Sequence, residues 1–168
     1  MNTWRLIAAL LTAGTALTNS IAETVLNAGQ YTVPAYYWQK GKALKLRVVV
    51  RTPSTNATDT LTVRCRVGPT TLVGTICHAT AAVDVANDDT STFDIEILCR
   101  GNPGTGQVLV VSVVASDPGT ASAVKSTTKV LTGLDLTAAQ LIEITGQWSV
   151  ANAGNQAQVE IFDVSESA

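Results

Sequence analysis

Apolar and polar residues alternate along much of the chain. In residues 43–51, Leu44, Leu46, Val48 and Val50 alternate with Lys45, Arg47 and Arg51. Successive side chains of a strand point to opposite faces, so this period of two predicts a half-buried strand. The same period recurs in three further runs, whose expected inward residues are Leu61, Val63, Cys65 and Val67, then Phe93, Ile95, Ile97 and Cys99, then Ile142, Ile144, Trp148 and Val150.

Other segments complete an all-β pattern that begins near Ile21. Residues 108–114 are almost continuously apolar, which predicts a strand buried on both faces, and residues 158–164 alternate less regularly. Turn-forming residues separate the runs, and only residues 136–141 suggest a short helical turn. We therefore expect residues 21–168 to form a single jelly-roll-like antiparallel β-sandwich of about eight or nine strands.

Residues 1–20 differ from the rest of the chain. They contain a largely apolar stretch, residues 6–17, after one basic residue, Arg5. Thr and Gly interrupt the stretch, and it is too short to span a bilayer. We expect an apolar N-terminal arm that serves attachment or oligomer contacts. The alternative is a secretory signal, which this pattern also resembles.

Composition supports a β protein with a weakly charged surface. The 168 residues include 24 Thr and 20 Val, both β-branched residues that favour strands. Only 14% of residues are charged and the formal net charge is −2, so no basic excess favours nucleic acid or an anionic membrane. Because burying charge is costly, a neutral exterior suggests oligomerisation or assembly. A monomer with a Thr-rich surface is the alternative.

Catalytic and metal-binding groups are scarce. His78 is the single histidine, and its neighbour Cys77 would point to the opposite face of a strand, so we expect no enzymatic activity. The three cysteines lack the spacing of metal ligands, and we expect them to be free and buried. A disulfide between two of them is the alternative. The glycine-rich residues 101–106 lack a following Lys-Ser or Lys-Thr and predict a loop. The sequence thus predicts neither a cofactor nor a metal.

Large apolar side chains are the candidate contact residues. Tyr36, Tyr37 and Trp38 follow a turn, and alternation prevents all three from facing inward, so they serve as a core plug or a subunit contact. Trp148 lies on an inward face and is expected in the core. The predicted partner contacts are Trp4, Leu6, Ile7, Leu10, Leu11, Tyr36, Tyr37 and Trp38.

Several segments together resemble small virion proteins of tailed bacteriophages. They are Thr15-Ala-Leu-Thr-Asn-Ser20, Tyr31-Thr-Val-Pro34, Lys40-Gly-Lys-Ala-Leu-Lys-Leu-Arg47, Leu61-Thr-Val-Arg-Cys-Arg-Val-Gly68, Phe93-Asp-Ile-Glu-Ile-Leu-Cys-Arg100, Glu143-Ile-Thr-Gly-Gln-Trp-Ser149 and Asn152-Ala-Gly-Asn155. The resemblance covers most of the chain. Such proteins are trimeric jelly-roll decoration (cement) proteins of the capsid, or related head and tail structural subunits.

The resemblance implies a non-enzymatic virion structural protein on the capsid surface. Such a subunit would form a homotrimer and bridge the major capsid protein or other virion subunits, without direct contact to nucleic acid or membrane. The alternative is a carbohydrate- or receptor-binding module of a tail fibre, or a secreted β-sandwich adhesin. Its site would use exposed aromatics and loop acids such as Tyr36, Tyr37 and Asp88.

Overall fold

The computed structural model describes residues 3–56, 58–104, 108–117 and 124–167. Every regular element in these ranges is a strand, and the described residues contain no helix long and apolar enough to cross a membrane. The twelve strands are β1 (Trp4–Ala9), β2 (Leu17–Thr18), β3 (Thr24–Val33), β4 (Ala43–Thr52), β5 (Thr60–Gly68), β6 (Thr75–Ala79), β7 (Val83–Asp84), β8 (Asp89–Cys99), β9 (Val108–Ser116), β10 (Val124–Thr132), β11 (Gln140–Trp148) and β12 (Gln156–Ser167).

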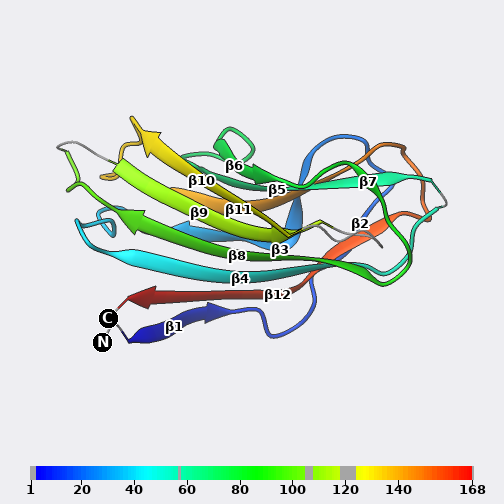
Figure 1. Cartoon of the computed structure of the whole chain (residues 1–168), viewed down its shortest axis with the longest axis horizontal. Helices are drawn as coiled ribbons and strands as arrows, with labels where there is room; N and C mark the ends of the chain where they lie inside the picture. Colours follow the sequence, from blue (N-terminus) through cyan, green and yellow to red (C-terminus); the bar gives the residue numbers. More distant parts are fainter. Residues whose placement is uncertain (1–2, 57, 105–107, 118–123, 168) are drawn as a thin grey trace.

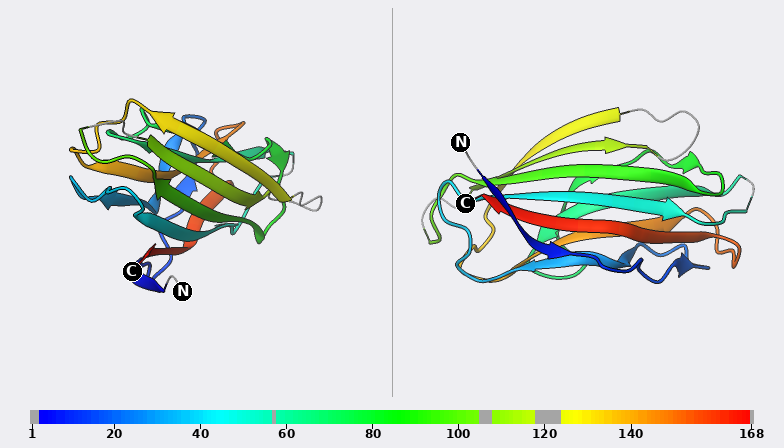
Figure 2. Two further views of the ribbon diagram at one scale, coloured as in Figure 1. Left: turned by 60° about the vertical axis from the view of Figure 1, so that its left-hand side comes forward. Right: turned by 90° about the horizontal axis from the view of Figure 1, so that it is seen from below.

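The strands form two antiparallel sheets around one apolar core (Figures 1 and 2). The larger sheet has the order β1-β12-β4-β8-β9-β10, with β2 paired to the start of β12. The smaller sheet has the order β3-β11-β5-β6, with β7 paired to β5. The predicted all-β antiparallel sandwich is therefore confirmed.

The strand order is that of a jelly roll with one additional hairpin. Along the chain, β3 to β4, β4 to β5, β6 to β8 and β11 to β12 each pass from one sheet to the other. This places β1-β12-β4-β8 opposite β3-β11-β5-β6, the two four-stranded sheets of a jelly roll. The hairpin of β9 and β10 extends the larger sheet beyond β8.

Alternation determines which side chains form the core. All twelve inward residues predicted for β4, β5 and β8 are at most 2% exposed. Across the larger sheet, Val48 lies opposite Phe93 and Leu46 lies opposite Ile95, so inward rows of neighbouring strands coincide. Trp38 and Trp148 are the largest fully buried side chains, which confirms the core position of Trp148. Cys65, Cys77 and Cys99 are free and buried, as predicted.

The structure corrects three local predictions. In β9, Leu109, Val111 and Val113 are buried but Val114 is 42% exposed, because nothing among the described elements covers the outer face of this strand. Val150 is 47% exposed because it follows the end of β11. Residues 136–141 contain a turn instead of a helical segment, with Ala138 N–H donating to Asp135 O.

Part of the predicted N-terminal arm lies in the larger sheet. Residues 4–9 form β1, which pairs antiparallel with β12 from Trp4 opposite Ser167 to Ala9 opposite Asp163. Leu10 N–H and Gly14 N–H then donate to carbonyls of the same strand, at 3.0 and 2.8 Å. This segment is therefore bound along the sheet edge, and its role in contacting a partner stays a prediction.

Candidate interaction surfaces

The predicted contact residues near the N-terminus divide into covered and exposed side chains. Ile7 and Leu10 are half-buried and pack against the core. The Trp4 ring is also half-buried, with Lys45 Nζ 4.3 Å from its centroid. Leu6 and Leu11 are 58% and 92% exposed, so they are the apolar side chains of this segment that a partner can reach.

The aromatic group at residues 36–38 also divides. Trp38 is fully buried and forms the core plug, so its predicted partner contact is corrected. Tyr37 is half-buried, and its hydroxyl donates to Glu166 Oε2 at 3.0 Å. Burial is the main reason that the pKa of Tyr37 is raised, and the Glu166 carboxylate adds to it. Tyr36 alone is 64% exposed, on a turn where its φ is 60°.

Residues suggested for a carbohydrate site are far apart. Tyr36 and Tyr37 precede the first residue of β4, whereas Asp88 N–H donates to Thr52 O at the last residue of that strand. Ten residues of extended strand span roughly 30 Å, which is too far for one sugar. Asp88 instead pairs with Arg51 at 2.8 Å.

A small apolar hollow opens between β1, β12 and β3. Its volume is about 220 Å³. Ala28 on β3 adopts a φ of 61° beside a register shift in the pairing of β3 with β11. None of the described residues that line the hollow carries a charge; they are Ala8, Ala9, Leu10, Ala28, Gln30, Tyr31 and Phe162.

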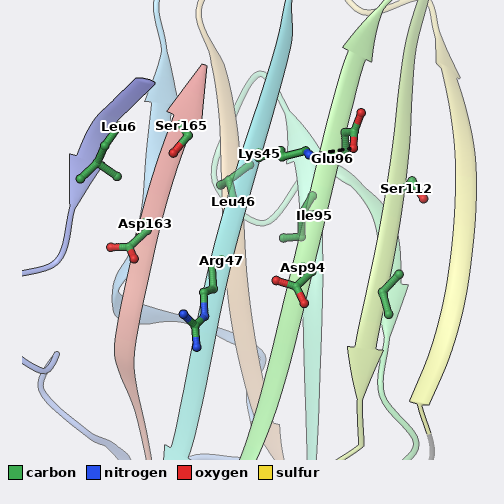
Figure 3. A pocket seen from close by; sticks show the side chains of 11 residues that line it. Leu6, Lys45, Leu46, Arg47, Asp94, Ile95, Glu96, Ser112, Asp163 and Ser165 are labelled. Atoms are coloured by element: carbon green, nitrogen blue, oxygen red, sulfur yellow. Dashed lines mark ion pairs between the residues drawn. The ribbon is translucent and has the colours of Figure 1, made fainter. Parts of the chain in front are cut away.

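The outer face of the larger sheet carries charges at its centre. A shallow depression of about 530 Å³ lies over β12, β4, β8 and β9 (Figure 3). Arg47 on β4 lies opposite Asp163 on β12 and Asp94 on β8. In the next row, Lys45 Nζ is 3.7 Å from Glu96 Oε2. Cross-strand neighbours therefore compensate one another's charge on this surface.

The outer face of the β9–β10 hairpin is different, since it has no charge. On β9 the residues alternating with the buried row face outward, and the register places Val124, Ser126, Thr128, Val130 and Thr132 of β10 beside them. We call this the hairpin face. Of its ten described residues none is charged, and they are Val108, Val110, Ser112, Val114, Ser116, Val124, Ser126, Thr128, Val130 and Thr132. Val114, Val124 and Val130 are 42%, 72% and 59% exposed.

The opposite side of β10 is polar. Lys125 Nζ lies 2.7 Å from Asp117 Oδ2, and Thr127 Oγ1 lies 3.0 Å from His78 Nδ1. His78 is 4% exposed, and this burial is the main factor that lowers its pKa. The nearby Asp117 carboxylate acts in the opposite direction. The buried imidazole packs edge-on against Phe93. This environment is that of a packed polar residue.

A polar network covers the outer face of the smaller sheet. Glu143 on β11 is only 1% exposed, although it belongs to the outward row. Gln30 Nε2 donates to Glu143 Oε1 at 2.6 Å, and Leu72 N–H donates to Oε2 at 3.0 Å. The loop of residues 70–74 is thereby held on the sheet with Val73 74% exposed. The alternating pattern alone gave no signal that this glutamate is buried.

The described residues contain no group of three or more His, Cys, Asp and Glu side chains that could hold a metal ion. Burial raises the pKa of Cys77 to about 11 and that of Cys65 well above its usual value. A thiol becomes a nucleophile as its thiolate. Both thiols therefore stay mostly protonated near neutral pH, which disfavours nucleophilic attack by either of them.

Comparisons with known proteins find structural likeness at low sequence identity. No protein-family model and no curated protein matches the sequence. Among solved structures, lectin UEA-II complexed with galactose aligns at a TM-score of 0.40 and 11% identity, covering 99% of this chain and 93% of that one. Lectin II from Ulex europaeus aligns at 0.40 and 10%, covering 95% and 93%. A chain of infectious bursal disease virus, Gx strain, aligns at 0.29 and 14%, covering 98% and 40%.

Proposed function

We propose that this chain is a non-enzymatic structural subunit of a bacteriophage virion, a decoration (cement) protein that bridges neighbouring capsid proteins on the head. The observation that carries the proposal is the uncharged hairpin face, which exposes three valines at the edge of the larger sheet. Exposed apolar area without charge is typical of surfaces that pack against other subunits. The resemblance of several segments between residues 15 and 155 to small virion proteins of tailed bacteriophages supports the same role.

The charge distribution supports a docking function for the hairpin face. The row of Lys45, Arg47 and their acidic neighbours occupies the centre of the same sheet, so the change from charged to uncharged surface occurs between β8 and β9. Lys125 and Lys129 both belong to the other side of β10. Inward-pointing lysines are a known device against pairing of edge strands. The hairpin therefore favours face contact over addition of another strand.

The proposed subunit is a homotrimer that needs neither cofactor nor metal, and it contacts the major capsid protein or other virion subunits without touching nucleic acid or membrane. Because the proposed contact surface is uncharged, raised salt should weaken assembly little. Light scattering at low and high salt measures this. A monomer at micromolar concentration in both conditions would contradict the trimer.

Virion association is the direct test of the function. Mass spectrometry of purified particles should find the chain at a copy number comparable with that of the capsid protein. Particles stripped of the chain should rebind added protein, and the double variant Val114→Glu/Val130→Glu should fold normally but bind poorly. The matched control is Val73→Glu/Val150→Glu, which changes two exposed valines away from the hairpin face.

Two results would overturn the proposal. One is absence of the chain from purified particles, and the other is equal rebinding of the two double variants. Absence from particles combined with saturable binding on a glycan array would favour the carbohydrate-binding alternative.

A further inference from the structure

We propose that Leu11 of one copy inserts into the apolar hollow between β1, β12 and β3 of a second copy, and that this contact joins the protomers. The inference deepens the proposed function, because it rests on self-association and names the contact. It concerns the edge of the larger sheet formed by β1, whereas the hairpin face lies at the other edge, formed by β10. One subunit can therefore use both surfaces at once.

Leu11 is held in its exposed position. Its side chain is 92% exposed, more than any other large apolar side chain among those described. The backbone is anchored on both sides of it, by Leu10 N–H to Phe162 O and by Gly14 N–H to Val159 O. Gly14 is buried, and a Cβ there would lie 2.2 Å from Asn27 O, so the loop lies tightly against β3. A solvent-exposed leucine between two anchored backbone positions needs little backbone ordering when a partner packs against it.

The hollow has the size and character to receive such a side chain. Apolar cavities of about 150 Å³ accept a molecule as large as benzene, and this hollow measures about 220 Å³. Ala8, Ala9 and Ala28 contribute only methyl groups to its lining, which leaves the space open. Its described lining carries no charge, so filling it with an aliphatic group leaves no charge unpaired.

The position of Leu11 favours a second copy as the occupant. Leu10 lines the hollow and Leu11 follows it directly, but the exposure of Leu11 shows that it does not fill the hollow of its own chain. Every copy therefore presents an exposed leucine next to its own apolar hollow. If copies are related by a rotation axis beside the β1 edge, Leu11 of each copy can enter the apolar hollow of the next. Such contacts close a symmetric assembly. The absence of charge in residues 6–17 suits such a contact between identical surfaces.

Cysteine cross-linking tests the contact directly. Leu11→Cys and an isotope-labelled Ala9→Cys protein are mixed and oxidised, and mass spectrometry identifies the linked peptides. We expect a disulfide between Cys at position 11 of one chain and position 9 of the other. The native cysteines are buried and give little background. The matched control replaces Leu11→Cys by Val73→Cys, which is exposed on the smaller sheet.

A second measurement uses sedimentation of the full chain. Leu11→Ser and the recess-filling variant Ala9→Phe should each weaken self-association roughly 10- to 100-fold, whereas Val73→Ser should not. Equal cross-linking by the Val73 control, or unchanged association of Leu11→Ser, would overturn the inference. Weaker particle binding by Leu11→Ser with unchanged self-association would also overturn it and assign Leu11 to a capsid contact. If the Leu11 contact is overturned, the proposed virion function is still tested separately, by the particle binding of the hairpin-face variants.

Discussion

The Glu23 carboxylate accepts two hydrogen bonds from the Arg66 guanidinium, at 2.7 Å from Nε and 2.8 Å from Nη2. Thr145 Oγ1 donates to the same carboxylate at 2.5 Å. These bonds hold the residues before β3 against the outer face of β5 and β11. The hydrogen bond from Arg66 is the main factor that lowers the pKa of Glu23, and partial burial acts in the opposite direction.

Replacing Glu23 should make the protein less stable at neutral pH. We expect Glu23→Gln to lower the free energy of unfolding by about 1–2 kcal/mol at pH 7. Since the pKa of Glu23 is lower in the folded state, its contribution is complete above the ordinary pKa of 4.5 and is lost as the pH falls through the lower folded value. Urea unfolding should show that the difference in free energy of unfolding between wild type and Glu23→Gln is smaller at pH 3.5 than at pH 7. Glu96→Gln, at an exposed pair, is the control.

His78 should make stability sensitive to mild acid. Burial lowers its pKa below 6.5 in the folded state, so the unfolded chain binds the proton more readily. The stability of the wild type should therefore fall as the pH drops below about 6.5 towards the folded pKa. We expect His78→Gln to keep the fold and to show a smaller loss between pH 7.5 and pH 5.5 in urea unfolding. An equal loss in both proteins would assign the acid sensitivity to carboxylates.

Deleting residues 1–11 should destabilise the sandwich. If these residues were a separable arm, the deletion would leave its stability unchanged. The deletion removes β1, which pairs with β12, and with it the half-buried Ile7 and Leu10. We expect a loss on the order of 3 kcal/mol, measured as a lower thermal midpoint. Deletion of residues 1–3 is the matched control, because it leaves the pairing of β1 with β12 in place. Equal midpoints for the two deletions would establish residues 1–11 as a true arm.

The three thiols should be protected in the folded protein. Cys65, Cys77 and Cys99 are buried, and burial raises the pKa of each. At pH 8 we therefore expect little thiolate and slow reaction with a thiol reagent such as DTNB. Full reaction of all three should follow unfolding in guanidinium. Rapid reaction of one thiol in the folded state would indicate local opening of the sheet that carries it.

Central strands could be predicted from sequence because their two faces meet different surroundings. In β4 and β8 one row packs in the core and the other faces water, so alternation identified both strands. Edge strands lack this contrast. β10 is mostly exposed on both faces, and its Lys, Ser and Thr residues are typical of a loop. In β1 the residues around Arg5 are apolar without regular alternation, which is typical of an arm.

The candidate surfaces were only partly predictable for a related reason. The exposed Leu6, Leu11 and Tyr36 were among the residues singled out from sequence, because large apolar side chains outside the predicted strands have no core of their own to fill. The apolar hollow was not, since β1, β3 and β12 meet there from distant parts of the chain. Trp38 was misassigned as a contact because local alternation does not tell which element closes the end of the core.

The position of β12 has a consequence for biogenesis. This strand lies between β1 and β4 and also pairs with β2, so the last of the described strands to be synthesised joins three that leave the ribosome much earlier. Until it arrives, β1 and β4 have no shared neighbour, and the apolar inner row of β4 is covered on one flank only. Pairing between such distant segments is slow and exposes strand edges in the meantime. The larger sheet should therefore close only after translation of residues 156–167, and nascent chains stalled before that point should depend on chaperones to stay soluble.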